Sequence, residues 1–185
     1  MTGHAKKMIN SFHEGLAAKA ETRALDVRVT AEWLMAMCID CRYPHIVHEY
    51  MRREHPKEIY DQVVLAGASL ALTDSYTQRD YWSKTFIEHI GLSIDLHNIG
   101  GVLILNHRTC GAFREFHLLT ANEENTNVEV ERHRHVAELA GELTLSVFRN
   151  KKHPGFVQVW LTPEVTDPAA DDFTSEPLLL FEKST

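Results

Sequence analysis

The chain has 185 residues, a length that suits one globular domain. Its apolar fraction of 44% and charged fraction of 24% are those of an ordinary folded protein, which excludes wholesale disorder. With 26 acidic and 19 basic residues the formal net charge is −7, so the chain lacks the basic surface that binds nucleic-acid phosphates. We therefore expect no nucleic-acid partner.

Neither a membrane span nor an export signal is expected from the sequence. The longest apolar runs, residues 33–38 and 102–105, have the length of strands and are too short to cross a bilayer. The first residues, MTGHAKKMINSFHEG, lack the apolar stretch and small-residue cleavage site of a secretory signal. We expect a cytoplasmic protein without membrane contact, whose three cysteines are reduced and available for metal or redox chemistry.

The first elements along the chain are a helical arm, a strand and a helix. Apolar residues at helical spacing within the Ala-rich residues 5–28 predict one or two amphipathic helices, which form an N-terminal arm of residues 1–30. The short apolar run of residues 32–38 predicts a buried strand. Pro44 favours the first turn of a following helix. The apolar face of that helix would consist of Ile46, Val47, Tyr50 and Met51.

The middle of the chain predicts two more strands and a long helix. Residues 62–68 indicate a second buried strand, and the polar residues 73–83 indicate a loop. Phe86, Ile90 and Ile94 then share one helical face, and the sequence Asn-Ile-Gly-Gly at residues 98–101 ends that helix through its glycines. The uninterrupted aliphatics of residues 101–107 are typical of a strand covered on both faces.

The last third predicts a short helix, a long helix and strands. Residues 110–116 indicate the short helix, and residues 156–162 alternate as a strand after Pro154 and Gly155. Residues 178–181 are either a docking segment or an added edge strand. The apolar stripe of the long helix is Val136, Leu139, Ala140, Leu143 and Val147. Because strands and helices alternate, we predict one α/β domain over residues 1–185, with a mainly parallel central sheet flanked by helices.

Two polar clusters directly follow predicted central strands. The first is CIDCR at residues 38–42, and the second is HRTCG at residues 107–111. Ligands of open α/β sheets gather beyond the carboxyl ends of the strands, where both clusters fall. Two thiolates and one imidazole form a Cys₂His set, the ligand type of a catalytic zinc site with an open fourth position. The alternatives are chance spacing among twelve histidines and a buried core role for Cys38.

The pattern C-x-D-x-R, followed after an aliphatic strand by H-x-x-C-G, resembles that of the β-class carbonic anhydrases. The resemblance is best over residues 37–42 and 86–113. It implies a parallel sheet flanked by helices, and a homodimer or higher homo-oligomer with active sites at the subunit interface. The implied activity is reversible hydration of CO2 to bicarbonate by zinc-bound hydroxide, so the partner is a small molecule.

Residue by residue, the resemblance implies that Zn2+ is bound by Cys38, His107 and Cys110 and that Asp40 and Arg42 form the catalytic dyad. Asp40 would accept a hydrogen bond from the hydroxide, and Arg42 would keep Asp40 ionised. Alternatively, Asp40 occupies the fourth zinc position in a closed resting form. The alternative to a catalytic role is that Asp40 and Arg42 form an ordinary ion pair within a turn.

This chain departs from the family pattern in the separation between its two motifs, which is longer than usual with the extra length in residues 73–83, and at three further places. Cys41 lies where the family usually has a small residue, Asn106 lies where it usually has glycine, and residues 65–69 lack the arginine and asparagine of its second strand. We predict that Cys41 points away from the metal and that its thiol is dispensable. His133 and His135 could suggest a second metal site, but we expect them on a solvated helix face.

Three other functions remain open. The spacing Cys38-x-x-Cys41 after a strand is also that of a thioredoxin-like thiol oxidoreductase, although that chemistry gives His107 and Cys110 no role. A zinc protein without turnover would keep the ligands and serve as a structural or binding module. A zinc enzyme of the same type would act on a CO2-like molecule such as COS or CS2.

Overall fold

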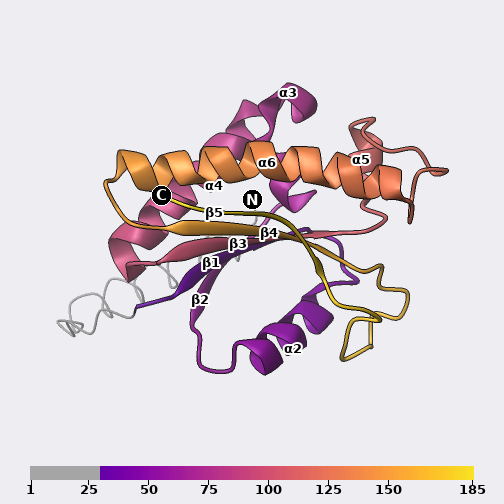
Figure 1. The fold of residues 1–185 in the computed structure, drawn as a ribbon, viewed down its shortest axis with the longest axis horizontal. Helices are drawn as coiled ribbons and strands as arrows, with labels where there is room; N and C mark the ends of the chain where they lie inside the picture. Colours follow the sequence, from indigo (N-terminus) through magenta and orange to yellow (C-terminus); the bar gives the residue numbers. More distant parts are fainter. Residues whose placement is uncertain (1–29) are drawn as a thin grey trace, which may run out of the picture.

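The structure is a computed structural model and describes residues 30–185 (Figure 1). The helical arm predicted for residues 1–30 therefore falls almost entirely outside the described residues. A five-stranded sheet forms the centre, in the order β2-β1-β3-β4-β5, and only β5 runs antiparallel to its neighbour. The strands are β1 (Trp33–Met37), β2 (Tyr60–Val64), β3 (Gly101–His107), β4 (Phe156–Thr162) and β5 (Leu178–Ser184).

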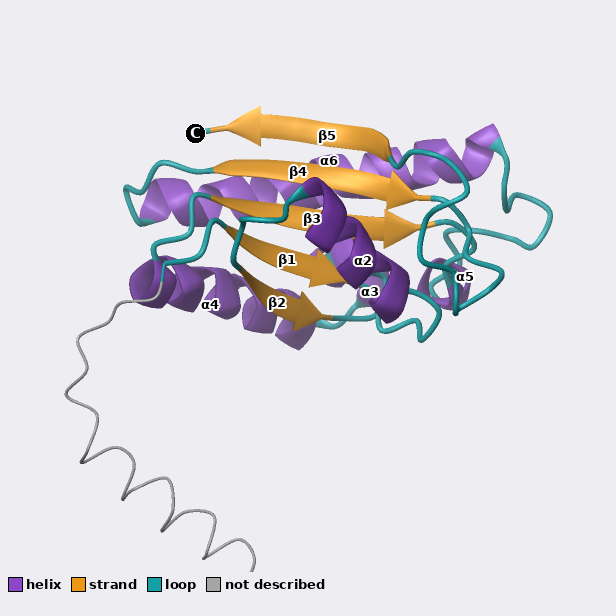
Figure 2. Cartoon of the chain, turned by 90° about the horizontal axis from the view of Figure 1, so that it is seen from below, coloured by secondary structure: helices purple, strands orange, loops and turns teal. Residues whose placement is uncertain are grey.

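Helices cover both faces of this sheet. The two long helices, α4 (Asp80–His97) and α6 (Asn127–Asn150), lie side by side on one face, and α2 (Pro44–Glu54) lies on the other (Figures 1 and 2). The helices bury apolar residues against alternate side chains of β1 and β3, which produces one apolar core on each face. The predicted α/β class with a mainly parallel sheet is confirmed.

The two central strands end at the same edge of the sheet. All seven residues of β3 are buried, as its continuous aliphatic sequence predicts for a strand covered on both faces. β3 pairs in parallel with β1, with Trp33 beside Gly101 and Met37 beside Leu105. The residues that follow both strands consequently emerge next to each other, which is what positions the candidate site.

Two local predictions about the helices are confirmed, and one about a helix end is corrected. Pro44 lies in the first turn of α2. Phe86, Ile90 and Ile94 are buried on one face of α4. This helix ends at Asn98, which adopts the left-handed conformation with φ 55°, so asparagine takes the position that we expected for glycine.

Other predictions need correction. Residues 62–68 are not a buried strand: β2 ends at Val64, lies at the sheet edge and alternates between partly buried and exposed side chains. The chain continues into a 3₁₀ helix, η1 (Ala68–Leu72). Residues 73–83 are not a loop, because they form the one-turn helix α3 (Asp74–Thr77) and the start of α4.

The C-terminal third contains two further differences. Leu139 was expected on the buried stripe of α6, yet it is exposed, because the buried face is centred on Val136 and Ala140. Residues 178–181, for which two alternatives were open, belong to the antiparallel edge strand β5. Within residues 30–185, none of the helices combines the length and apolar character needed to cross a membrane.

Candidate metal centre

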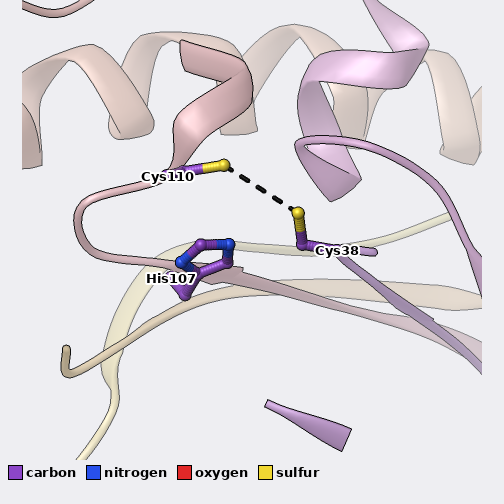
Figure 3. A group of neighbouring side chains, drawn as sticks. All are labelled: Cys38, His107 and Cys110. Atoms are coloured by element: carbon purple, nitrogen blue, oxygen red, sulfur yellow. Dashed lines mark hydrogen bonds between the residues drawn. The ribbon is translucent and has the colours of Figure 1, made fainter. Parts of the chain in front are cut away.

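Three buried side chains from two loops meet beyond the ends of β1 and β3 (Figure 3). Cys38 directly follows β1, His107 is the last residue of β3, and Cys110 immediately precedes the short helix α5 (Gly111–Glu115). One ligand atom from each residue lies within 4.8 Å of the other two. The structure thus brings together the three residues that the sequence singled out as zinc ligands.

The geometry of this cluster fits a tetrahedral zinc ion. The Sγ atoms of Cys38 and Cys110 are 3.9 Å apart, close to the separation of about 3.8 Å between two thiolates bound about 2.3 Å from one tetrahedral zinc. His107 Nδ1 lies 2.9 Å from the backbone oxygen of Arg108, so it donates its proton there. The other nitrogen, Nε2, is buried without a hydrogen-bond partner among the described residues, which leaves its lone pair free for a metal.

The pair of thiols loses its first proton easily and its second proton only with difficulty. The hydrogen bond from Cys110, followed by the influence of His107, lowers the pKa of Cys38 to about 4. The Gly67 backbone N–H, 3.2 Å from Cys38 Sγ, adds to this effect. The same pairing and burial raise the pKa of Cys110 far above its usual range. A divalent cation between the sulfurs would remove this opposition, because its charge stabilises both thiolates.

Asp40 and Arg42 form a bidentate ion pair at the border of the cluster. Arg42 Nε donates to Asp40 Oδ1 at 3.0 Å, and Nη2 donates to Oδ2 at 2.8 Å. These hydrogen bonds lower the pKa of Asp40 and raise that of Arg42. Asp40 Oδ2 is also 3.9 Å from His107 Nε2, so an ionised carboxylate lies directly beside the candidate ligands.

A cavity of about 360 Å³ opens onto the cluster and the carboxylate. Its walls combine Cys38 and Asp40 with the aromatic rings of Trp82 and Phe116. Arg79 lines the same cavity, with its guanidinium 5.1 Å from the Trp82 ring centroid. Cys41 is exposed and is not among the clustered residues, which agrees with the prediction that it points away.

The sequence did not reveal several residues that support this site. Tyr43 lies against His107, with ring centroids 4.1 Å apart, and its hydroxyl donates to the Pro163 carbonyl and accepts from the Val165 N–H. Glu164, beyond β4, lies 3.9 Å from Arg42 Nη1 and accepts from the Thr109 hydroxyl. These contacts join segments far apart in the chain, and no spacing within the sequence signals them.

The histidines of α6 also differ from expectation. His133 is fully buried, so the prediction of a solvated face is wrong for it, whereas His135 is exposed. The His133 ring lies against Phe113, with centroids 3.8 Å apart and ring planes tilted by 33°, and neither of its nitrogens has a hydrogen-bond partner within residues 30–185. Asn106, where the family usually has glycine, accepts from the Ser69 N–H and hydroxyl and so ties η1 to β3.

Two curated proteins of Rickettsia are similar to part of the chain. The chain is 36% identical over 108 residues to an uncharacterized protein of Rickettsia conorii, and 36% identical over 106 residues to one of Rickettsia bellii. These matches cover 58% and 57% of this chain. The chain spans just over half the length of these curated relatives, 55% and 61% respectively.

Two solved structures resemble the chain at 13% sequence identity. A Coccomyxa β-carbonic anhydrase in complex with acetazolamide has a TM-score of 0.42, with 95% of this chain and 87% of that chain covered. A tetrameric β-carbonic anhydrase of Sordaria macrospora has a TM-score of 0.36, with 88% and 93% covered. The family described as "Putative carbonic anhydrase" matches residues 30–144. Because this match extends over more than half of the chain and includes both motifs, the protein belongs to that family.

Proposed function

We propose that the protein binds one zinc ion through Cys38, His107 and Cys110 and catalyses the reversible hydration of CO2 to bicarbonate. The observation that carries this proposal is the buried Cys₂His cluster with an arginine-held carboxylate beside it. Three protein ligands leave one position of a tetrahedral zinc open, as a catalytic site requires. Family membership supports the same chemistry.

When bound, zinc supplies a Lewis acid that lowers the pKa of a coordinated water. Asp40 has no proton to donate at neutral pH, and the hydrogen bonds from Arg42 lower its pKa further below that range. Its carboxylate therefore only accepts hydrogen bonds, and it orients the proton of a water or hydroxyl group beside His107 Nε2. Arg42 is the positioning residue of this pair, since its two parallel hydrogen bonds fix the plane of the carboxylate.

The two thiolates and the imidazole have complementary roles. Cys38 and Cys110 together balance the charge of a divalent ion, and His107 is oriented by its hydrogen bond to the Arg108 carbonyl. The aromatic walls provided by Trp82 and Phe116 give the cavity an apolar surface suited to a small uncharged molecule such as CO2. We further propose that residues 1–185 form a single domain, with residues 1–30 as its helical arm, and that the protein forms a homo-oligomer.

The structure disfavours the thiol oxidoreductase. A disulfide between Cys38 and Cys41 would need the two sulfurs to face each other, whereas the sulfur near Cys38 is that of Cys110 and Cys41 is exposed. The zinc protein without turnover and the enzyme acting on COS or CS2 share the proposed ligand set, so only activity distinguishes them from the proposed function.

The test combines metal analysis with a stopped-flow assay of CO2 hydration on the purified full-length chain. We expect one zinc per chain and hydration that a chelator abolishes and added zinc restores. Hydrolysis of COS, measured on the same preparation, distinguishes the substrate alternative. Full zinc occupancy without hydration of CO2 from neutral to alkaline pH would contradict the proposed activity and leave the zinc site standing.

A further inference from the structure

Thr109, between the two candidate ligands of the second loop, has an unusual backbone conformation. Its φ is 56°, in the left-handed region that β-branched residues rarely adopt. Such a conformation persists only where the surroundings enforce it. All three polar groups of Thr109 are engaged: its N–H by Glu129 at 2.6 Å, its hydroxyl by Glu164 at 3.2 Å, and its carbonyl by Arg42 Nη2 at 3.5 Å.

Glu129 makes the shortest of these contacts, and it is fully buried in the first turn of α6. Its Oε1 accepts from the Thr109 N–H, and its Oε2 accepts from the Asn125 N–H at 2.8 Å and from Arg108 Nη1 at 3.1 Å. A buried carboxylate is costly unless it is paired and hydrogen-bonded, and here both oxygens are satisfied. Two of its three partners, Arg108 and Thr109, lie between His107 and Cys110.

An ordinary helix cap explains only part of this arrangement. Thr126 caps α6, and Glu129 three residues later completes the sequence pattern of a capping box, whose glutamate binds a backbone N–H just before the helix. The contact of Oε2 with the Asn125 N–H is of this kind. The contacts with Arg108 and Thr109 reach a loop about twenty residues earlier in the chain and add nothing to the cap.

We propose that Glu129 is a positioning residue of the metal centre. By holding the Thr109 N–H and the Arg108 guanidinium, it fixes residues 107–110 in the turn that presents His107 and Cys110 to Cys38. This inference rests on the proposed zinc site, because it assigns Glu129 a role in metal affinity. It also means that α6, which contributes no ligand, determines how well the second loop binds the ion.

Glu129→Gln is the direct test, because it keeps the shape of the side chain and removes its charge. The amide NH₂ cannot accept a hydrogen bond, so either the Thr109 N–H or the pair formed by Arg108 and the Asn125 N–H loses its acceptor. We expect the zinc affinity, measured by competition with a chromogenic chelator, to fall about 10- to 100-fold, as for other residues that orient metal ligands. Glu131→Gln, on the same helix with a side chain that is 71% exposed, should leave the affinity unchanged.

Two further variants separate positioning from a general loss of stability. Leu145→Ala removes a fully buried side chain of α6 that lies in the apolar core between α6 and the sheet, so it should lower the melting temperature without lowering the zinc affinity. Thr109→Gly supplies a residue that adopts positive φ freely. If Glu129 acts by enforcing this conformation, the double variant Thr109→Gly with Glu129→Gln should bind zinc more tightly than Glu129→Gln alone.

Hydrogen exchange of the residue 109 amide in the metal-free full-length chain provides a readout independent of zinc. We expect this amide to be protected in the wild type and in Glu131→Gln, and to exchange at least 10-fold faster in Glu129→Gln. Unchanged zinc affinity and unchanged exchange in Glu129→Gln would overturn the inference, and so would an equal loss of affinity in Leu145→Ala. A wild type that binds no zinc would overturn the proposed function, while the exchange comparison would still decide whether Glu129 fixes the turn.

Discussion

The two loops that build the candidate site differ sharply in exposure. At the end of β3 and in the loop after it, His107, Thr109 and Cys110 are 2%, 8% and 1% exposed, and Glu129 accepts a hydrogen bond from the Thr109 N–H. In the loop after β1, Cys41 is exposed and the carboxylate of Asp40 borders the cavity. A buried loop whose backbone is held by hydrogen bonds suits metal binding, whereas a partly open loop suits contact with substrate. Under the proposed function, metal retention therefore depends on the loop after β3 together with Cys38, and reactivity depends on Asp40 and Arg42 of the loop after β1.

The strongest test of this division is to remove a ligand from the buried loop. Cys110→Ala or His107→Ala should release the zinc, because two remaining ligands do not hold it. With zinc in about 100- to 1,000-fold excess over the dissociation constant, the wild type should be about 3–4 kcal/mol more stable than without zinc, and the variants should not respond to zinc. Urea unfolding with and without the metal measures the difference, and full zinc occupancy in Cys110→Ala would refute the ligand assignment.

A substitution in the open loop should have the opposite profile. Asp40→Asn should retain zinc and reduce kcat for CO2 hydration about 100-fold or more, because the amide pairs poorly with Arg42 and presents an NH₂ group to the reacting water. Asp171→Asn, which alters an exposed pair with His45, serves as the matched control and should retain full activity. Loss of zinc in Asp40→Asn would indicate that the carboxylate is itself a ligand.

The sequence predicts the parts of this molecule that depend on local pattern. The aliphatic run of residues 101–107 identified β3 within its observed bounds, and the residues directly after two parallel strands identified the cluster. Both inferences work because parallel strands end at one edge of a sheet, whatever the rest of the fold does.

Other features of the structure depend on which helices and strands pack against each other, and the local sequence pattern carries no information about that packing. The apolar residues 62–68 suit a buried strand, yet within residues 30–185 β2 pairs with β1 alone and is partly exposed. Glu129 and His133 read as polar positions of a helix, and their burial follows from the packing of α6 against the loop before α5. Leu139 is exposed because the buried face of α6 is centred on Val136 and Ala140 and leaves Leu139 on the solvent side.

His133 offers a pH-dependent test of the buried region. Burial, followed by the electrostatic influence of His107 and Arg108, lowers its pKa to about 3, against about 6.5 in the unfolded chain. The nearest carboxylate, Glu129 Oε1, lies 4.0 Å from its Nε2. Below about pH 6.5 the unfolded state therefore binds one more proton, so this group's contribution to stability is present above that pH and lost as the pH falls towards 3.

We expect His133→Leu to remove this contribution. In metal-free wild-type protein, the free energy of unfolding falls as the pH is lowered from 6 to 5, partly because His133 is kept neutral in the folded state. We expect this fall to be smaller in the variant, by about 1.4 kcal/mol per pH unit. Urea titrations at pH 7.5, 6 and 5 measure the slopes. Parallel slopes would show that His133 is not held neutral in the folded protein.

The smallest effect is expected at the exposed cysteine. Cys41→Ser should keep its zinc, its stability within about 0.5 kcal/mol and its hydration rate, because the thiol is exposed and outside the cluster. Metal analysis and the stopped-flow assay on this variant make the comparison. A thiol oxidoreductase would lose its function through this change, and a four-ligand structural site would lose affinity for zinc.

X-ray absorption at the zinc edge of the wild-type protein tests the central claim most directly, because it counts the sulfur ligands and measures their distances. The account predicts two sulfurs at about 2.3 Å, with the remaining ligands nitrogen or oxygen at about 2.0–2.1 Å. The same spectrum from Cys41→Ser should be superimposable, while that from Cys110→Ala should lack zinc altogether. Three sulfurs in the wild type, or a zinc-supplemented wild type that binds no metal, would contradict a site made of Cys38, His107 and Cys110.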